Sequence, residues 1–507
     1  MRRRRLTGDK PVKEMRIAFV SIFDITRLFF EIGRGLERDG HRVFWITTDR
    51  LWTRWLTGRG VGRDSILELV YKKTDFLDRR TKKQILRELV ASETKSELTA
   101  NQVLLMDQFV KYKNKSDINE YVYLYYRDIK NFLTANRITH VCAEPTNTNE
   151  MITYILCQEL GIKFIAPRPA RYPQGRLLFM TSYRDSDYYP RLHPESELNG
   201  RQLIEDFVEG EPTPDYCVKH NKRRLLDIKK LAISLANRLR TGKIFSQDNL
   251  THHDLRGRIK LQLQGIVNSF YMRFICRFDH LADIDGRIAY FPLHVQPESS
   301  IDVMGSYFSD QLKLIKDIRR ALPFDTTLII KEHPNFLDMN KGSFFKALRR
   351  IPNVKMIRYD ISTFEILQRA DIVFTVSGTS AYEAGLLGIP AVTFCPMFFA
   401  GMSSVHTCTD INELKNVVFK LLGEFKRDYR ADCDFMAKLI GNSFPALWDN
   451  PLRSPQVLND ENLRRLHHAF SELLGTEADS ISESREMDIG YVVENVTHDE
   501  EKTAVAL

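Results

Sequence analysis

Short apolar runs alternate with helical segments through much of the second half of the chain, and this rhythm constrains the fold more than any other feature. The β-rich runs are Ile288–Leu293, Thr326–Lys331, Val354–Ile357, Asp371–Val376 and Ala391–Phe394. Each is too short for a stable helix, and the segments between them have helical spacing. Strand, helix, strand succession of this kind predicts a parallel sheet with helices on both faces.

The first half of the chain shows the same rhythm more loosely. Arg16–Ile22 and Arg42–Thr47 are predicted strands around a helix at Thr26–Arg38. Further strands are expected at Thr139–Ala143 and Lys163–Ala166, with a helix between them. No G-x-G-x-x-G follows the first strand, so NAD or FAD binding loses its usual support. We therefore predict an α/β protein with two Rossmann-like domains facing a cleft.

These patterns divide the 507 residues into six parts. They are a basic N-terminal extension at 1–14, a Rossmann-like domain at 15–204 with a helical insertion at about 62–135, a basic helical linker at 205–286, a second Rossmann-like domain at 287–425, C-terminal helices at 426–475 and an acidic disordered tail at 476–507. Ligands of open parallel sheets bind at the carboxyl ends of the strands, so the loops there are the candidate sites.

Charge is strongly segregated, although the formal total is only +8. Between Lys219 and Lys260, twelve Lys or Arg residues against three Asp give +9, and Lys222–Lys243 is predicted to form an amphipathic helix with a basic face. Two roles stay open for this helix: packing between domains, or attraction to an anionic membrane. Nucleic acid is not expected, because aromatic interleaving and a known binding module are missing.

The sequence favours a cytoplasmic location. No stretch approaches the ~20 apolar residues of a membrane span, and no apolar region follows the basic N-terminus as in a secretory signal. The 7 cysteines contain no C-x-x-C pair, which fits a reducing compartment. The inner face of the cell membrane stays open as a place of action.

Two loops of the second half have the residue types of a phosphate site. In KEHP, Lys331 and His333 would share one face of the strand end, although a histidine bonded to a backbone carbonyl is the alternative. In SGTS, glycine permits close approach, the hydroxyls can bind anions, and a helix N-terminus follows. The residues of this loop are Ser377, Gly378, Thr379 and Ser380. Glu383 either forms a capping box with Ser380 or accepts from ribose hydroxyls.

Three carboxylates are candidates for acid–base chemistry. Glu298 lies in the loop HVQPESSID, and Asp24 and Glu144 follow strands of the first half. Each has a structural alternative: Asp24 can N-cap the next helix, and Glu144 can stabilise its loop.

Three stretches of the second half together resemble the capsule polysaccharide biosynthesis family: FPLHVQPESS, LIIKEHP and ADIVFTVSGTSAYEAGLLGIPAV. That family includes capsule Kdo transferases and is similar to other GT-B glycosyltransferases. The resemblance is strong over 287–399 and looser around EPTNTNE and YPQGR. It implies that Gln296 and Glu298 lie near the donor sugar, and we place Ser300 of the same loop with them. It also implies phosphate contacts for His333, Ser377, Thr379 and Ser380, to which the loop patterns add Lys331, Gly378 and Glu383 as nucleotide or phosphate contacts.

The expected function follows from this resemblance. It is sugar transfer from a nucleotide-activated donor, CMP-linked rather than UDP-linked, to a glycan or lipid-linked acceptor bound by the first domain. We expect no cofactor and no metal, since the Asp-x-Asp pairs at Asp185 and Asp283 lie outside the crevice loops. The alternatives are a nucleotide-sugar epimerase, a CDP-polyol phosphotransferase, and a non-catalytic export partner docked at the membrane through Lys219–Lys260.

Overall fold

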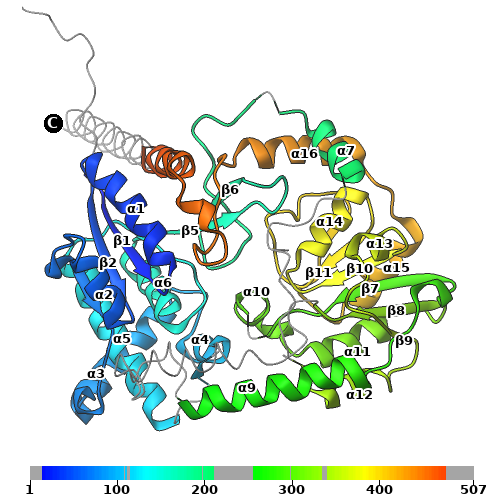
Figure 1. Ribbon diagram of the computed structural model, residues 1–507, viewed down its shortest axis with the longest axis horizontal. Helices are drawn as coiled ribbons and strands as arrows, with labels where there is room; N and C mark the ends of the chain where they lie inside the picture. Colours follow the sequence, from blue (N-terminus) through cyan, green and yellow to red (C-terminus); the bar gives the residue numbers. More distant parts are fainter. Residues whose placement is uncertain are drawn as a thin grey trace, which may run out of the picture.

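In the computed structural model the chain forms two α/β lobes, each built on a six-stranded sheet (Figure 1). The structure describes residues 14–107, 109–110, 115–196, 198–210, 255–296, 298–333 and 340–475. The basic residues 1–13, most of the Lys219–Lys260 segment and the acidic tail at 476–507 lie outside the described residues. The predicted fold class, two facing Rossmann-like units, is confirmed.

The N-terminal lobe has the strand order β3-β2-β1-β4-β5-β6, parallel except for β6. Its strands are β1 (Arg16–Ser21), β2 (Arg42–Thr47), β3 (Ile66–Glu68), β4 (His140–Cys142), β5 (Lys163–Pro169) and β6 (Leu177–Met180). Its helices are α1 (Ile25–Arg38), α2 (Arg50–Thr57), α3 (Arg79–Glu93), α4 (Ala100–Met106), α5 (Lys115–Ala135) and α6 (Thr148–Leu160). The segment 62–135 contains helices α3, α4 and α5 and also contributes the edge strand β3.

The C-terminal lobe has the order β12-β11-β10-β7-β8-β9, and all its strand pairs are parallel. Its strands are β7 (Arg287–Pro292), β8 (Thr326–Lys331), β9 (Val354–Ile357), β10 (Ile372–Thr375), β11 (Ala391–Thr393) and β12 (Val405–Thr407). Its helices include α10 (Ser299–Asp302), α11 (Gln311–Ala321), α12 (Gly342–Leu348), α13 (Thr363–Leu367), α14 (Thr379–Leu387) and α15 (Leu414–Glu424). The central strands are buried along almost their whole length because helices cover both faces of the sheet.

The chain crosses between the lobes more than once. Helix α7 (Gly200–Gly210) comes from the first half but packs on α14 and on α16 (Tyr429–Gly441) beside the C-terminal lobe (Figure 1). In return, the helix at 460–475 packs on the N-terminal lobe, where the rings of Phe470 and Phe179 lie 4.8 Å apart. Each lobe is therefore completed by residues from the other half of the chain.

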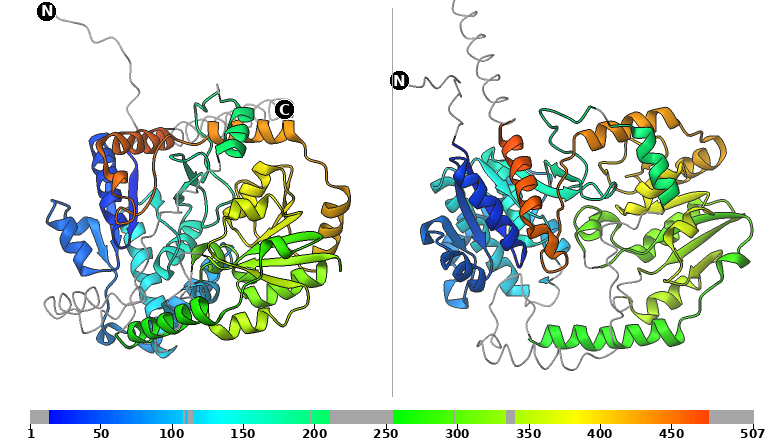
Figure 2. Two further views of the ribbon diagram at one scale, coloured as in Figure 1. Left: turned by 45° about the vertical axis from the view of Figure 1, so that its right-hand side comes forward. Right: turned by 45° about the horizontal axis from the view of Figure 1, so that its top comes forward.

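Helix α9 (Leu255–Phe270) runs along the lower edge of the molecule, beneath both lobes (Figure 2). It continues into a single π-helical turn at Tyr271–Ile275. No helix in the described ranges combines the length and the apolar content that crossing a bilayer requires.

Candidate active site

A cavity of about 340 Å³ opens between the lobes, with walls from both. Its lining residues are Ile22, Phe23, Ile25, Met106, Glu144, Thr146, Asn147, Glu150, Glu298, Ser299 and Asn450. Most of them follow the carboxyl ends of β1 and β4 in one lobe or the end of β7 in the other, whereas Met106 ends α4 and Asn450 lies between α16 and the helix at 460–475. This is where ligands of open parallel sheets bind, and two of the three predicted carboxylates, Glu144 and Glu298, lie here.

Glu144 is held in place by the segment that returns from the far end of the chain. Its Oε1 accepts a hydrogen bond of 2.7 Å from the indole Nε1 of Trp448. Burial raises the pKa of the Glu144 carboxyl, while the neighbouring Arg168 guanidinium and the Trp448 hydrogen bond oppose this rise. The carboxyl is thus oriented and shifted toward neutral pH, which suits a general base.

Glu150 is a further carboxyl of the cavity that the sequence prediction did not include. Its Oε2 accepts from the backbone N–H of Thr146 at 2.8 Å and from that of Asn147 at 3.0 Å. Burial raises the pKa of Glu150 to about 8 despite these hydrogen bonds. The available signal was its place in a capping box at the start of α6, which indicates a structural role as readily as a chemical one.

Phe23 enters the cavity from a strained position. It follows β1 with a φ of 53°, in the left-handed region that bulky residues rarely adopt. Phe23 is 39% exposed and lines the cavity with Ile22 and Ile25. Strained backbone of this kind clusters at functional sites, where surrounding structure maintains it.

The loop that carries Glu298 is fixed from beneath by His294 and Gln311. The Gln311 side chain accepts from the His294 backbone N–H at 2.7 Å and donates to Gln296 Oε1 at 2.8 Å. His294 Nε2 accepts from the backbone N–H of Val376 at 3.0 Å, so the ring proton lies on Nδ1. Burial, and secondly the nearby His333, lower the pKa of His294 to about 4, and it stays neutral.

Within this loop, the predicted donor-sugar residues bond to their neighbours. Gln296 Nε2 donates to Asp302 Oδ1 at 2.8 Å and to the Ser309 carbonyl at 2.9 Å. Ser300 Oγ donates to Glu298 Oε2 at 3.1 Å. Desolvation between the cavity walls raises the pKa of Glu298, although its side chain still reaches solvent. Gln296 therefore holds the loop, while Glu298 projects into the cavity.

The SGTS loop leads from β10 into α14. Gly378 is the N-cap, and a Cβ there would lie only 2.5 Å from Thr375 Oγ1, so a side chain has no room. Ser377 Oγ donates to the Ser300 carbonyl at 2.5 Å, which joins this loop to the Glu298 loop. Thr379 begins the helix. Ser380 Oγ is buried, and within the described part of the chain it has no hydrogen-bond partner.

The predicted capping box between Ser380 and Glu383 is wrong. The helix begins at Thr379 after an N-cap glycine, so Ser380 lies inside the first turn and its hydroxyl caps nothing. Burial raises the pKa of Glu383 to about 7, with Lys331 opposing the shift. Glu383 therefore lies close to the end of β8 and is about half protonated near pH 7.

The KEHP loop places its side chains in different surroundings. Lys331 is buried, and its Nζ donates to the Ile361 carbonyl at 2.8 Å and to Thr363 Oγ1 at 2.9 Å. The His333 backbone N–H donates to Glu332 Oε1, and the ring is partly exposed near His294. Pro334 lies outside the described residues. Lys331 thus ties β8 to the start of α13, whereas the His333 ring is accessible.

Asp24 is the one predicted carboxylate outside the cavity lining. It occupies the N-cap position of α1 without a capping hydrogen bond from its side chain, and Oδ1 lies 3.7 Å from Arg27 Nε. Of the Asp-x-Asp pairs, Asp185 is buried against Arg168 at 2.9 Å. In the described ranges no three His, Cys, Asp or Glu side chains gather as a metal site.

Comparison with known proteins gives a family for part of the chain. Residues 250–411 match the family described as capsule polysaccharide biosynthesis protein. No curated protein matches the chain. Among solved structures, the KpsC beta Kdo 2,7 transferase of Thermosulfurimonas dismutans is similar over 69% of this chain and 89% of that chain, at 14% identity and a TM-score of 0.33.

A UDP-GlcNAc 2-epimerase from Methanocaldococcus jannaschii is similar over 83% of this chain and 96% of that chain, at 13% identity and a TM-score of 0.25. Neither structural likeness is close enough to assign an activity. The family match covers the HVQPESS, KEHP and SGTS loops, whose resemblance to this family is thereby confirmed. At residues 250–411 the chain is therefore similar to the capsule polysaccharide biosynthesis family.

Proposed function

We propose that the protein is a glycosyltransferase of capsule or surface polysaccharide biosynthesis that uses a nucleotide-activated sugar. The observation that carries this proposal is the interlobe cavity, into which carboxyls project from both lobes: Glu144 and Glu150 from one, and Glu298 from the other. The family match at 250–411 supports the polysaccharide context. The N-terminal wall would take a glycan or lipid-linked acceptor, and the C-terminal wall the donor.

The donor phosphate would bind at the start of α14. A helix N-terminus offers N–H groups and a positive dipole end to an anion. Gly378 lets the phosphate approach the backbone, and the Ser380 hydroxyl, buried without a partner among the described residues, would gain one. His333 would add a donor from the neighbouring loop, and Thr379 a hydroxyl. CMP-linked sugars are favoured over UDP-linked sugars, as the family resemblance implies.

The reaction would proceed by displacement at the anomeric carbon. The acceptor hydroxyl oxygen forms the new bond to that carbon, and its proton passes to Glu144. The bond from the anomeric carbon to the phosphate oxygen breaks, and its electron pair remains on the nucleotide. The α14 N-terminus stabilises the charge that develops there. Glu298 would stabilise positive charge on the sugar ring. Catalysis without a divalent metal stays a prediction, which EDTA treatment tests.

Two buried serines provide a matched test of the donor site. Ser380 and Ser404 both have a buried Oγ without a partner in the described part of the chain, but only Ser380 lies at the α14 N-terminus. We expect Ser380→Ala to weaken binding of CMP or CDP about tenfold, because one hydrogen bond to a charged group is lost. Ser404→Ala should bind as wild type does. Thermal-shift titration with CMP, CDP and UDP measures both, and equal affinity in both variants would contradict the site.

The carboxylates are tested by turnover. Glu144→Gln and Glu298→Gln should each lower kcat by about a hundredfold or more while nucleotide binding persists. Transfer of radiolabelled sugar to an acceptor glycan, with and without EDTA, is the measurement. Normal transfer by both variants would refute the assignment. Conversion of a nucleotide sugar in the absence of any acceptor would instead identify an epimerase.

A further inference from the structure

Helix α9 and the turn after it expose apolar side chains to solvent. The exposed apolar residues are Leu263, Ile266, Val267, Phe270, Phe274 and Ile275, which we call the α9 apolar face. Val267 is 66% exposed and Phe274 65%. The steps from Leu263 to Val267, Phe270 and Phe274 are four, three and four residues, so these side chains share one side of the helix. The Phe270 and Phe274 rings contact each other, 5.0 Å between centroids.

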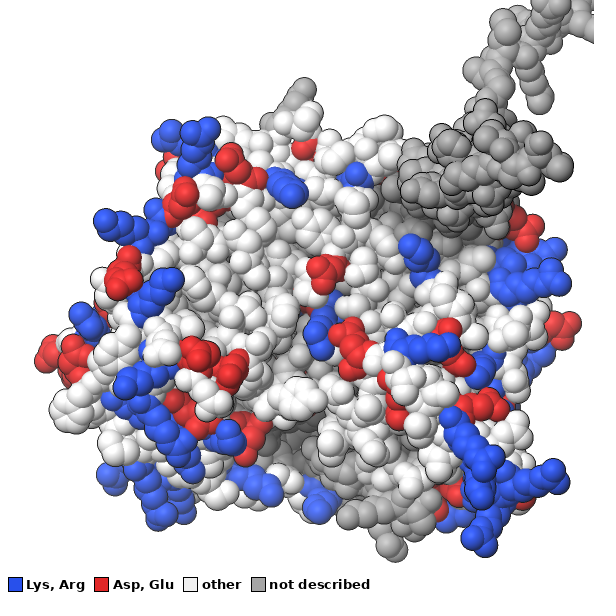
Figure 3. Space-filling model, turned by 180° about the vertical axis from the view of Figure 1, so that it is seen from behind, with Lys and Arg blue, Asp and Glu red and all other residues white. Residues whose placement is uncertain are grey.

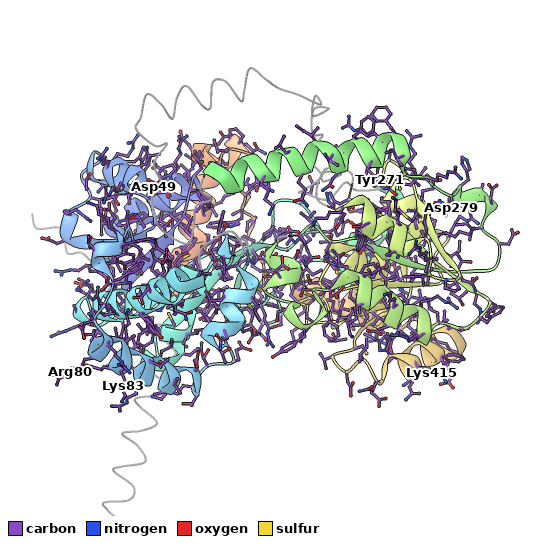
Figure 4. The ribbon with its side chains drawn as sticks, turned by 90° about the horizontal axis from the view of Figure 1, so that it is seen from below. Asp49, Arg80, Lys83, Tyr271, Asp279 and Lys415 are labelled. Atoms are coloured by element: carbon purple, nitrogen blue, oxygen red, sulfur yellow. The ribbon has the colours of Figure 1, made fainter. Side chains whose placement is uncertain are left out.

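Few side chains of the same helix are buried against the protein. Asn268 and Met272 are its buried residues among the side chains described from Lys260 to Ile275. At its C-terminal end Tyr271 stacks on Phe345 of α12, 6.2 Å between ring centroids at 14°. Seen from below, α9 crosses both lobes and Tyr271 lies at its end over the C-terminal lobe (Figure 4). A helix packed only on its own core buries its apolar side, so the exposure of this side among the described residues points to a partner beyond them.

Positive charge borders the α9 apolar face. The described Lys and Arg side chains from Lys260 to Arg277 are Lys260, Arg273 and Arg277, all exposed, and this stretch of the sequence has no Asp or Glu. The adjoining stretch 341–350 adds four Lys or Arg residues, again without an acid, and Arg349 Nη2 donates to the Arg277 carbonyl at 2.9 Å. Lys and Arg side chains are also frequent along the lower edge of the molecule when it is seen from behind (Figure 3).

We propose that the α9 apolar face docks the protein on an anionic lipid bilayer. The exposed aliphatic and aromatic side chains enter the boundary between headgroups and acyl chains, and the bordering Lys and Arg residues contact anionic headgroups. This places the contact on helix α9 and the turn after it, whereas the sequence pattern alone indicated the segment Lys219–Lys260. The inference does not depend on the proposed reaction, since a chain without transferase activity would dock in the same way.

Charge favours a bilayer over a second copy of the chain. A symmetric dimer through this face would bring two copies of the same surface together. Most of the bordering Lys and Arg residues of both copies would then face each other, because Leu255–Arg277 and 341–350 contain no acid. Arg349 does have an acid nearby, with its Nη2 3.9 Å from Asp279 Oδ2. An anionic bilayer supplies both the apolar phase and the opposite charge.

The test is vesicle co-sedimentation of the full chain. Wild type should bind vesicles of phosphatidylcholine with about 30 mol% phosphatidylglycerol, and bind pure phosphatidylcholine roughly tenfold more weakly. Val267→Glu/Phe270→Glu/Phe274→Glu should reduce binding to the anionic vesicles at least about tenfold. The matched control is Phe324→Glu, which alters an exposed aromatic (91% exposed) elsewhere and should bind as wild type does. Circular dichroism checks that all variants are folded, and Phe274→Ser replaces the triple variant if it is not.

Four results would overturn the proposal. The first is no binding of wild type to anionic vesicles. The second is undiminished binding of the triple variant. The third is a loss of binding caused only by charge reversal within Lys222–Lys243. The fourth is wild-type self-association that the triple variant abolishes, without any vesicle binding, which would assign the face to a second copy.

Discussion

At the scale of single residues, Phe23 offers the clearest separation of stability from function. Its φ of 53° is costly for any residue with a Cβ, by about 1–2 kcal/mol, but not for glycine. The free energy of unfolding of Phe23→Gly, measured in urea, should therefore be about 1 kcal/mol higher than that of Phe23→Ala. Both lack the ring that lines the cavity, so both should lose acceptor-dependent transfer equally. Equal stability of the two variants would show that the backbone is not strained.

Glu150 makes stability depend on pH. Burial raises its pKa from 4.5 to about 8, so the folded protein binds this proton more tightly than the unfolded chain. That contribution to stability is fully present below about pH 4.5 and is lost as pH rises through about 8. Glu150→Gln can still accept from Thr146 and Asn147 but cannot ionise.

The free energy of unfolding of Glu150→Gln, relative to that of wild type, should therefore increase with pH. Between about pH 5 and 8 we expect the difference in free energy of unfolding to rise by more than about 1 kcal/mol. Urea titrations of both proteins across this range measure the difference. A difference that stays constant with pH would place the titrating group elsewhere.

At the scale of elements, the start of α14 depends on a missing side chain. A Cβ on Gly378 would lie 2.5 Å from Thr375 Oγ1 and 3.3 Å from His294 Cε1, so Gly378→Ala should cost about 1–3 kcal/mol of stability and weaken nucleotide binding. Gly423, in α15, is the matched control because a Cβ there meets nothing within 4 Å. Gly423→Ala should stabilise the helix by about 0.5–1 kcal/mol. Similar urea midpoints for both variants would contradict this account.

The sequence predicted elements well where local pattern decides. The five β-rich runs of the second half coincide with β7 to β11, because buried parallel strands show continuous apolar runs. β3 was missed, since a strand of 3 residues gives no period to detect. The C-terminal helix 460–475 was expected, but not its place on the other lobe, which depends on long-range contacts such as Phe470 with Phe179.

The candidate site was predictable only in part for the same reason. Glu144 and Glu298 follow strand ends, and strand ends can be found from the sequence. Trp448, which orients Glu144, lies 304 residues away along the chain and belongs to no motif. Lys331 has the right residue type for a phosphate contact, but its hydrogen bonds to Ile361 and Thr363 could not be inferred from the strand pattern.

At the scale of the whole molecule, the crossing segments couple the two lobes. α7 packs on α16 and α14, and the backbones of Leu177 and Phe444 pair as an isolated bridge. Arg176 joins the same region by donating to the Ile440 carbonyl at 2.7 Å. Unfolding one lobe would therefore remove part of the packing of the other.

This coupling predicts one cooperative transition, which the tryptophans can test. All 4 belong to the N-terminal lobe or to the segment returning to it: Trp45, Trp52, Trp55 and Trp448. Tryptophan fluorescence thus reports that lobe, whereas far-ultraviolet circular dichroism reports both. In urea the two signals should have the same midpoint. Phe470→Ala should lower the free energy of unfolding obtained from each signal by the same amount, about 3–5 kcal/mol. A fluorescence change that precedes the dichroism change would mean that the lobes unfold independently.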